Sequence, residues 1–348
     1  MLHHAPEITI LVTARERLNL QEEWVYSVQG LPFPARVEDG RHSGTLPAPA
    51  SDYSAVTLFL QRARQAVTSF APTYDEMVEI VRICQLVEGM PLGLELAAPW
   101  LRTLSCREIA QEMQQSLDFL TTPLRNLPER HRSLRVVFAQ SWQRLSPTEQ
   151  TVLQGLSIFR SGCTRQAAEQ VTGATLPILS SLVDKALLRR TASGRYELHE
   201  LIRQFAEAQV TVALHAVEQA QQRHQAYFIM FLETRTTGIK GARQKAILNE
   251  IRADMDNIRL IWRRTVENRD VQAIERSSEC LFVFYLYNSG HYEGQVAFQQ
   301  AVAALTTFPD ALVDDDQTQD LVILDKQENL VGFRLAVQAY FLARTSGR

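Results

Sequence analysis

The chain has 348 residues, which is long enough for several packed domains. Hydrophobic residues make up 45% of it, which excludes wholesale disorder. The formal net charge of -3 argues against a protein that binds nucleic acid through overall positive charge. The four cysteines lie far apart without any Cys-x-x-Cys, which excludes a compact zinc ribbon and favours buried, reduced thiols in a cytoplasmic protein. Residues 1–7 lack the features of a secretory signal, and no apolar run approaches the roughly 20 residues that cross a bilayer, so no membrane association is expected.

The first predicted element is a short strand at residues 8–13, Ile-Thr-Ile-Leu-Val-Thr. A nearly unbroken, β-branched apolar run is typical of an inner strand of a parallel α/β sheet. Nothing similar recurs downstream with alternating helices, so we expect either an orphan strand or partner strands encoded upstream. Residues 30–50 are punctuated by proline, glycine and serine, which predicts a connector or flexible insertion.

Helical periodicity begins after residue 50. Ser51 or Asp52 could cap a first helix. The apolar residues on one face of this helix would be Val56, Phe59, Leu60 and Ala63. A second helix is expected to begin at Thr73 and to end at Gly89, and Pro91 would open a third at a position where proline is tolerated.

Residues 146–149, Ser-Pro-Thr-Glu, predict the clearest helix start, because serine at the cap and glutamate three positions later form a capping box. The next helix would stop at Gly173, and another would run over about 176–186. A β-hairpin turning at residues 193–194 would follow. Three helices followed by a hairpin is the order of a winged-helix domain.

Beyond about residue 213 the pattern is all helical, and helices are expected near residues 214–233, 242–267, 271–288 and 291–306. Long amphipathic stretches with short breaks are typical of helical-hairpin repeats, and residues 290–305 have the spacing of a tetratricopeptide helix. At most two or three degenerate units are present. We expect these repeats to bind a protein partner or ligand on their concave face, and self-association stays open.

Four stretches in a fixed order resemble the signal-transduction NTPases of the NB-ARC or STAND class, in particular the ATPase segments of large bacterial transcriptional regulators. Residues 10–24 are similar to the sensor strand of that family and residues 88–98 to its Gly-x-Pro motif. Residues 130–159 are similar to the entry into its winged helix, and residues 196–206 to its Met-His-Asp stretch, which reads Leu-His-Glu here.

The resemblance implies a mainly α chain that follows a remnant of an α/β P-loop NTPase. The expected segments are an NTPase remnant at 1–35, a connector at 36–50, a helical lid at 51–127, a winged helix at 128–212 and a TPR-like α-solenoid at 213–348. It also implies a nucleotide switch, in which the lid and winged helix close over ADP and swing away with ATP.

The resemblance further implies a set of nucleotide-binding residues. Arg15, with Thr13 beside it, would contact a terminal phosphate through its guanidinium. Pro91, next to Gly89, would pack against the adenine and sugar, and His199 would reach a diphosphate. Each residue also has a purely structural explanation: a surface arginine at a strand end, helix punctuation by glycine and proline, and a capping or buried histidine.

The phosphate-binding loop Gly-x-x-x-x-Gly-Lys-[Ser/Thr] does not occur in the sequence, and neither does an N-terminal strand ending in acidic residues that would place Mg²⁺. In the family both elements precede the sensor strand. The chain is therefore expected to be the C-terminal part of such a protein: a gene remnant, a misplaced start or one half of a split protein. We expect no ATPase activity, weakened binding of ADP or ATP, and no metal site.

The main rival function is DNA binding through the winged helix. A reading helix needs exposed Arg, Asn or Gln side chains. The outer face of the third helix instead offers Pro177, Ser180, Ser181, Asp184 and Lys185. The arginines that could meet phosphates are Arg130, Arg132, Arg135, Arg189, Arg190 and Arg195. This pattern argues against DNA binding by this segment, and a scaffold whose repeats bind a partner regardless of nucleotide is the third alternative.

Overall fold

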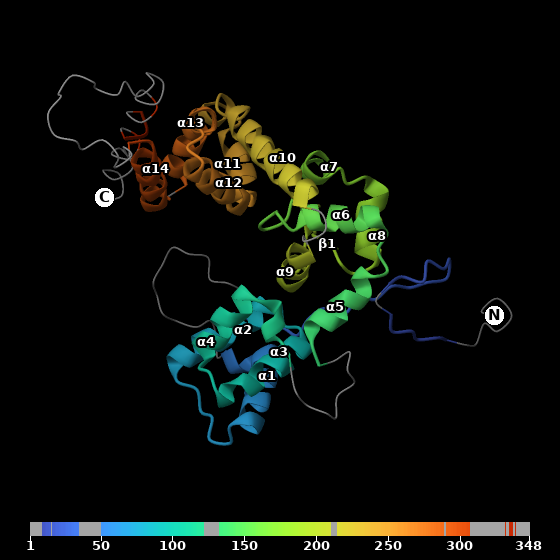
Figure 1. Ribbon diagram of the computed structural model, residues 1–348. Coiled ribbons are helices and arrows are strands. Elements are labelled where there is room, and N and C mark those ends of the chain that lie inside the picture. Colours follow the sequence, from blue (N-terminus) through green and yellow to red (C-terminus); the bar gives the residue numbers. More distant parts are fainter. Residues whose placement is uncertain are drawn as a thin grey trace. The chain divides into compact units, whose positions relative to one another are not determined.

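The computed structural model describes residues 9–14, 16–34, 50–121, 132–209, 214–288, 290–306, 331, 334–336 and 338. Over these residues the fold is mainly α, as predicted from the sequence, with one two-stranded sheet (Figure 1). The chain divides into two compact units, one within residues 1–157 and 174–214 and the other within 158–173 and the residues after 214. In the described part of the chain, no helix has the length and apolar character needed to span a bilayer.

Residues 50–121 form a cluster of short helices. These are η2 (Ala50–Asp52), α1 (Ser54–Ala66), α2 (Tyr74–Leu86), α3 (Pro91–Ala97), η3 (Ala98–Arg102), α4 (Cys106–Gln115) and η4 (Leu117–Phe119). Helix α2 packs against α4, and α1 packs against α3 and η3. Capping boxes at Thr73 and Ser105 satisfy the first amide groups of α2 and α4, which explains why these two helices begin where they do.

The predicted cap of the first helix is wrong, although its buried face is confirmed. Helix α1 is preceded by Tyr53, whose side chain makes no capping bond. Ser51 and Asp52 lie one turn earlier in η2, because the Tyr53 amide already donates to the carbonyl of Ala50. The four apolar residues predicted on one face of this helix are all buried.

Residues 132–209 carry the predicted order of three helices and a hairpin. Their elements are α5 (Leu134–Trp142), α6 (Pro147–Leu156), α7 (Arg165–Thr172), α8 (Leu176–Asp184), β1 (Arg189–Arg190), β2 (Tyr196–Glu197) and α9 (Glu200–Ala208). The capping box at Ser146 is confirmed, and so is the stop at Gly173, which has a φ of 74°. Strands β1 and β2 are antiparallel, and Gly194 in their turn has a φ of 81°. The winged-helix assignment itself remains a prediction.

The strand predicted at residues 8–13 is not formed by the described residues 9–14, which belong to no strand. Ile10 and Leu11 are 54% and 94% exposed. A single strand without neighbours has no partner for its backbone groups and buries little apolar surface, so a β-branched run alone does not hold it. The strand prediction for the described residues 9–14 is therefore wrong.

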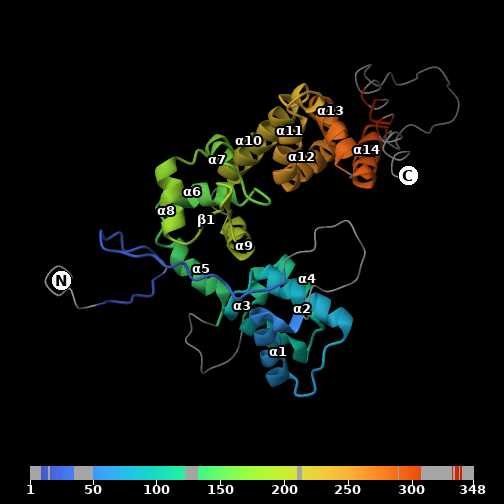
Figure 2. The same cartoon turned by 180° about the vertical axis from the view of Figure 1, so that it is seen from behind.

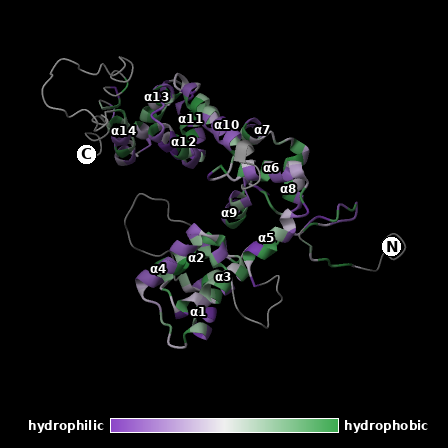
Figure 3. Ribbon diagram, viewed as in Figure 1, coloured by the Kyte–Doolittle hydropathy of each residue, from purple (hydrophilic) through white to green (hydrophobic). Residues whose placement is uncertain are grey.

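The second unit contains the helices after residue 214. These are α10 (Leu214–Glu233), η7 (Gly238–Lys240), α11 (Gln244–Ala253), α12 (Met255–Glu267), α13 (Val271–Tyr287) and α14 (His291–Thr306) (Figure 2). Consecutive helices from α11 to α14 pack on one another, and each mixes hydrophobic with hydrophilic positions (Figure 3). The helix predicted at 242–267 is two helices, because Asp254 leaves the helical conformation with φ -112° and ψ 13°. The assignment of these helices as tetratricopeptide repeats stays a prediction.

Residues 158–173, which include α7, belong to this second unit rather than to the rest of the predicted winged helix. Asn257 on α12 fixes the turn that leads into α7. Its Oδ1 accepts from the Arg160 amide at 2.7 Å, and its Nδ2 donates to the Gly162 carbonyl at 3.0 Å. The Phe159 ring lies 4.9 Å from the imidazole of His224 on α10. Polar and aromatic contacts together thus anchor this segment to α10 and α12.

Candidate functional site

The turn at residues 88–91, Glu-Gly-Met-Pro, connects α2 to α3 and carries two of the predicted nucleotide-binding residues. Glu88 and Gly89 both have positive φ angles, of 44° and 68°. The Gly89 amide donates to the Cys84 carbonyl at 2.9 Å, and Pro91 occupies the first position of α3. Burial raises the pKa of the Cys84 thiol to about 12, so this thiol stays protonated and inert.

A second backbone segment crosses this turn at close range. The Leu31 amide donates to the Gly89 carbonyl at 2.8 Å. A Cβ atom on Gly89 would lie 2.0 Å from the Leu31 carbonyl oxygen, and one on Gly30 would lie 2.1 Å from the Glu88 carbonyl oxygen. Both glycines are therefore required by the contact between the two backbones. This finding supports the structural explanation of Gly89 without testing its proposed contact with a nucleotide.

His199 lies beside the same turn. It is the N-cap residue of α9, where its Nδ1 accepts from the Leu201 amide at 3.1 Å. Its Nε2 lies 3.2 Å from the Val87 carbonyl oxygen. Because a carbonyl only accepts, the proton is assigned to Nε2 and the imidazole is neutral. The capping role named as the structural alternative is thus confirmed, and it holds the ring against the turn that contains Gly89.

Arg189 is a further charged group at this turn. Its guanidinium bonds the Glu197 carboxylate across the hairpin at 2.8 Å and lies 3.7 Å from the Glu88 carboxylate. The hydrogen bond to Glu197 raises the pKa of Arg189, partial burial opposes it, and the charge of Glu88 adds to the rise. The sequence predicted Arg189 only as a DNA-phosphate contact. The ion pair with Glu197 was readable from the hairpin register, whereas the approach to Glu88 is long-range.

The structure therefore brings three of the five predicted site residues to one turn: Gly89 and Pro91 lie on it, and His199 contacts it through Val87. Thr13 lies on the exposed segment 9–14. Arg15 lies outside the described residues, so its approach to His199 remains a prediction. Among the residues that the structure describes, no group of three or more His, Cys, Asp or Glu could hold a metal ion.

At this turn a neutral imidazole N–H and a guanidinium stand beside a backbone bend. These groups are donors, and donors suit the oxygens of a phosphate. In this structure the Nε2–H of His199 donates to the Val87 carbonyl. The Arg189 guanidinium is paired with the carboxylates of Glu197 and Glu88. Both donors are therefore already engaged by oxygen atoms of the chain itself.

Two arginines proposed to meet DNA phosphates are engaged within the protein. Arg135 donates to both carboxylate oxygens of Asp118 at 2.8 Å, and Arg189 is bound as described above. Arg130 lies outside the described residues. Ion pairs within the chain reduce the positive potential that would attract a nucleic acid.

Comparison with known proteins finds relatives among bacterial regulators. The chain is 26% identical over 289 residues to "Putative HTH-type transcriptional regulator Rv0890c" of Mycobacterium tuberculosis, a match that covers 80% of this chain and 30% of that protein. "Putative HTH-type transcriptional regulator Mb0914c" of Mycobacterium bovis matches with the same identity and coverage. "Uncharacterized protein Rv0894" of Mycobacterium tuberculosis is 29% identical over 219 residues, or 59% of this chain and 51% of that protein.

The chain thus spans less than a third of the length of the two regulators and about half of the third relative. No family model matches the chain, and no solved structure matches it significantly.

Proposed function

We propose that this chain is a regulatory segment of a bacterial transcriptional regulator of the NB-ARC or STAND class, and that the turn at residues 88–91 and His199 respond to a bound adenine nucleotide. One observation carries the proposal. His199 Nε2 lies 3.2 Å from the Val87 carbonyl, which joins two motifs 112 residues apart in the sequence. The regulator names of the two mycobacterial relatives support the regulatory part of it.

In this proposal the diphosphate of ADP competes with the Val87 carbonyl for the imidazole N–H. Pro91 and Gly89 would face the adenine and sugar, while Arg15 and Thr13 would approach the terminal phosphate. The chain contains no phosphate-binding loop, and its own residues supply neither the lysine clamp nor a positioned metal, so we propose sensing without ATP hydrolysis. Helices α10–α14 would carry the surface for a protein partner or for self-association.

Titration of the purified chain with fluorescently labelled ADP tests the proposal. The variant His199→Ala should weaken binding at least tenfold, because it removes a donor to a charged phosphate. His291→Ala is a matched control, since His291 Nε2 also bonds a backbone carbonyl, that of Leu286 at 2.9 Å, but in the second unit. Circular dichroism of both variants checks that the fold is retained. Absence of ADP binding in the wild type, or equal binding by His199→Ala, would refute the nucleotide role.

A second candidate is a regulator that binds DNA through the helices and hairpin of residues 132–209. The helix-turn-helix wording in the names of the two relatives favours it. Electrophoretic mobility shifts at 50 and 200 mM salt distinguish the two functions, because binding through phosphate contacts weakens steeply over that range. Salt-dependent binding that is lost on changing Arg189 and Arg190 to alanine would favour DNA binding over nucleotide sensing.

A further inference from the structure

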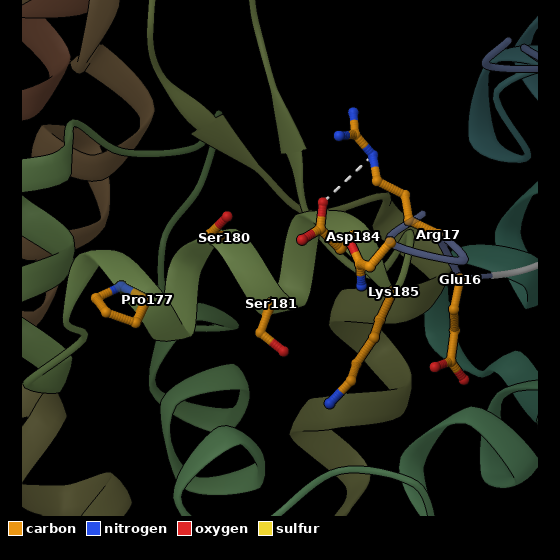
Figure 4. Close-up of a pocket in the computed structure, with 8 residues that line it drawn as sticks. Glu16, Arg17, Pro177, Ser180, Ser181, Asp184 and Lys185 are labelled. Atoms are coloured by element: carbon orange, nitrogen blue, oxygen red, sulfur yellow. Dashed lines mark ion pairs between the residues drawn. The ribbon is translucent and has the colours of Figure 1, made fainter. Parts of the chain in front are cut away.

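The outer face of α8, where a winged helix would present its reading residues, borders a polar cavity of about 300 Å³. One wall comes from this helix and its C-cap residue. The residues of that wall are Pro177, Ser180, Ser181, Asp184 and Lys185. The facing wall comes from Glu16, Arg17 and Asn19, far away in the sequence (Figure 4). We name residues 16–23 the strap.

The strap is attached to this face by complementary charge. The Arg17 amide donates to the Asp184 carbonyl at 3.2 Å, and the Arg17 guanidinium pairs with the Asp184 carboxylate at 3.3 Å. A second ion pair, from Arg144 to Glu16 at 3.0 Å, holds the start of the strap beside the end of α5. Opposite charges on the two walls thus place this segment over this helix.

The strap also has a conformation of its own. The amides of Leu18 and Asn19 donate to the two carboxylate oxygens of Glu23 at 3.0 and 2.9 Å. The Glu23 amide donates back to the Leu20 carbonyl at 3.1 Å. A turn closed by its own side chain loses less conformational entropy on docking than an unstructured segment does. The strap is therefore prepared to dock as a unit.

The polar groups of α8 leave little for a nucleic acid to contact. Ser181 donates to the Glu149 carboxylate of α6 at 2.6 Å, and Lys185 donates to the same oxygen at 2.7 Å. Asp184 is an anion, which repels phosphate, and it is already paired with the strap. Ser181 and Lys185 are thus bonded to α6, and Asp184 is paired with the strap.

We propose that the outer face of α8 is a docking face for the strap of its own chain, so that the docked strap covers the face that a winged helix would use to read DNA. The docking is releasable, because its ion pairs are solvent-exposed: the Arg17 and Arg144 side chains are 50% and 64% exposed. Exposed pairs are individually weak and are screened by salt. The contacts that carry this inference involve neither His199 nor the turn at residues 88–91.

Hydrogen exchange of the full chain tests the docking. Arg17→Glu and Asp184→Arg should each speed exchange of the strap amides about threefold to fivefold, as expected from the loss of an exposed ion pair. The double variant, in which the charges are reversed, should restore slow exchange. Arg62→Glu breaks a comparable exposed pair with Glu95 on α1 and α3, and should leave the strap unchanged. Unaltered exchange of the α8 amides shows that the variants are folded.

Two results would overturn the proposal. Strap amides that exchange in the wild type as fast as in a free peptide would show that the strap is not docked, and a double variant no slower than the single ones would show that the pairing is not specific. In parallel, fluorescence anisotropy with a 20-base-pair duplex at low salt should detect no binding to the wild type. Binding that is lost on changing Ser180 to glutamate would make α8 a DNA-contacting helix instead.

Discussion

His224 on α10 makes the second unit sensitive to acid. The imidazole is fully buried and lies 4.8 Å from the Phe228 ring, and its Nδ1 atom has no hydrogen-bond partner among the residues that the structure describes. Burial lowers the pKa of His224 from 6.5 to about 4; the contact with Asn257 opposes this shift, and the positive charges of Arg264 and Arg160 add to it. We predict that the variant His224→Gln, which cannot be protonated, resists acid unfolding better than the wild type.

The size of the effect follows from the two pKa values. Between pH 6.5 and about 4 the unfolded chain carries a proton on His224 that the folded unit does not. The stability gained from the neutral imidazole is therefore fully present above pH 6.5 and is lost as the pH falls towards 4. At about 1.4 kcal/mol for each pKa unit, the loss amounts to roughly 3 kcal/mol. This is a large fraction of the stability of a typical domain.

Urea unfolding at pH 7.0 and pH 4.5 measures the prediction. Trp262, which lies within the second unit, can report on it alone if Trp24, Trp100 and Trp142 are replaced by phenylalanine. The free energy of unfolding falls between pH 7.0 and pH 4.5 in both proteins. In His224→Gln this fall should be about 2–3 kcal/mol smaller than in the same tryptophan-replaced protein that retains His224. Equal losses in the two proteins would refute the reasoning, because another group would then carry the acid sensitivity.

Four substitutions test other parts of the fold by urea unfolding. Asn257→Leu removes the bonds that fix the turn before α7 and should cost about 2–4 kcal/mol; a cost below 1 kcal/mol would contradict the anchoring role. Gly89→Ala should cost more than about 3 kcal/mol, because the new methyl group would clash with the Leu31 carbonyl oxygen. Gly173→Ala is the control: Gly173 has a similar φ but no atom near the position of a Cβ, so the cost should be only about 1–2 kcal/mol. Glu149→Gln weakens a bond of 2.7 Å to the Lys185 ammonium and should cost about 2–3 kcal/mol; a negligible loss would contradict a stabilising role for this bond.

Local chemistry made much of the helical part of the fold predictable. Thr73 and Ser146 begin helices because their side chains satisfy amides of the first turn, and both signals depend only on residues three positions apart. Gly173 ends α7 because glycine adopts the left-handed conformation without strain. The break at Asp254 was missed because neither glycine nor proline marks it. It is accompanied instead by a hydrogen bond from the side-chain Nδ2 of Asn257 to the Asp254 carboxylate.

The candidate site was predictable only in part, because it depends on contacts between distant segments. The sequence singled out Gly89 and His199 but gave no means of placing the imidazole against the Val87 carbonyl. The strap was equally hidden, since the pairing of Arg17 with Asp184 spans most of the first unit. The strand prediction at residues 8–13 was wrong for the same reason. A strand needs neighbouring strands to pair with, and the apolar residues of one segment do not show whether such neighbours exist.

The place of residues 158–173 in the second unit has a consequence for biosynthesis. The segment leaves the ribosome before α10 and α12 have been synthesised. About 100 further residues must be made before Asn257 can bond the turn that leads into α7. During that interval the Phe159 ring lacks the His224 ring, which lies 4.9 Å from it in the folded unit. Nascent chains of this protein should therefore depend on chaperones until α12 has emerged, even though the helices on either side of the segment can already have folded.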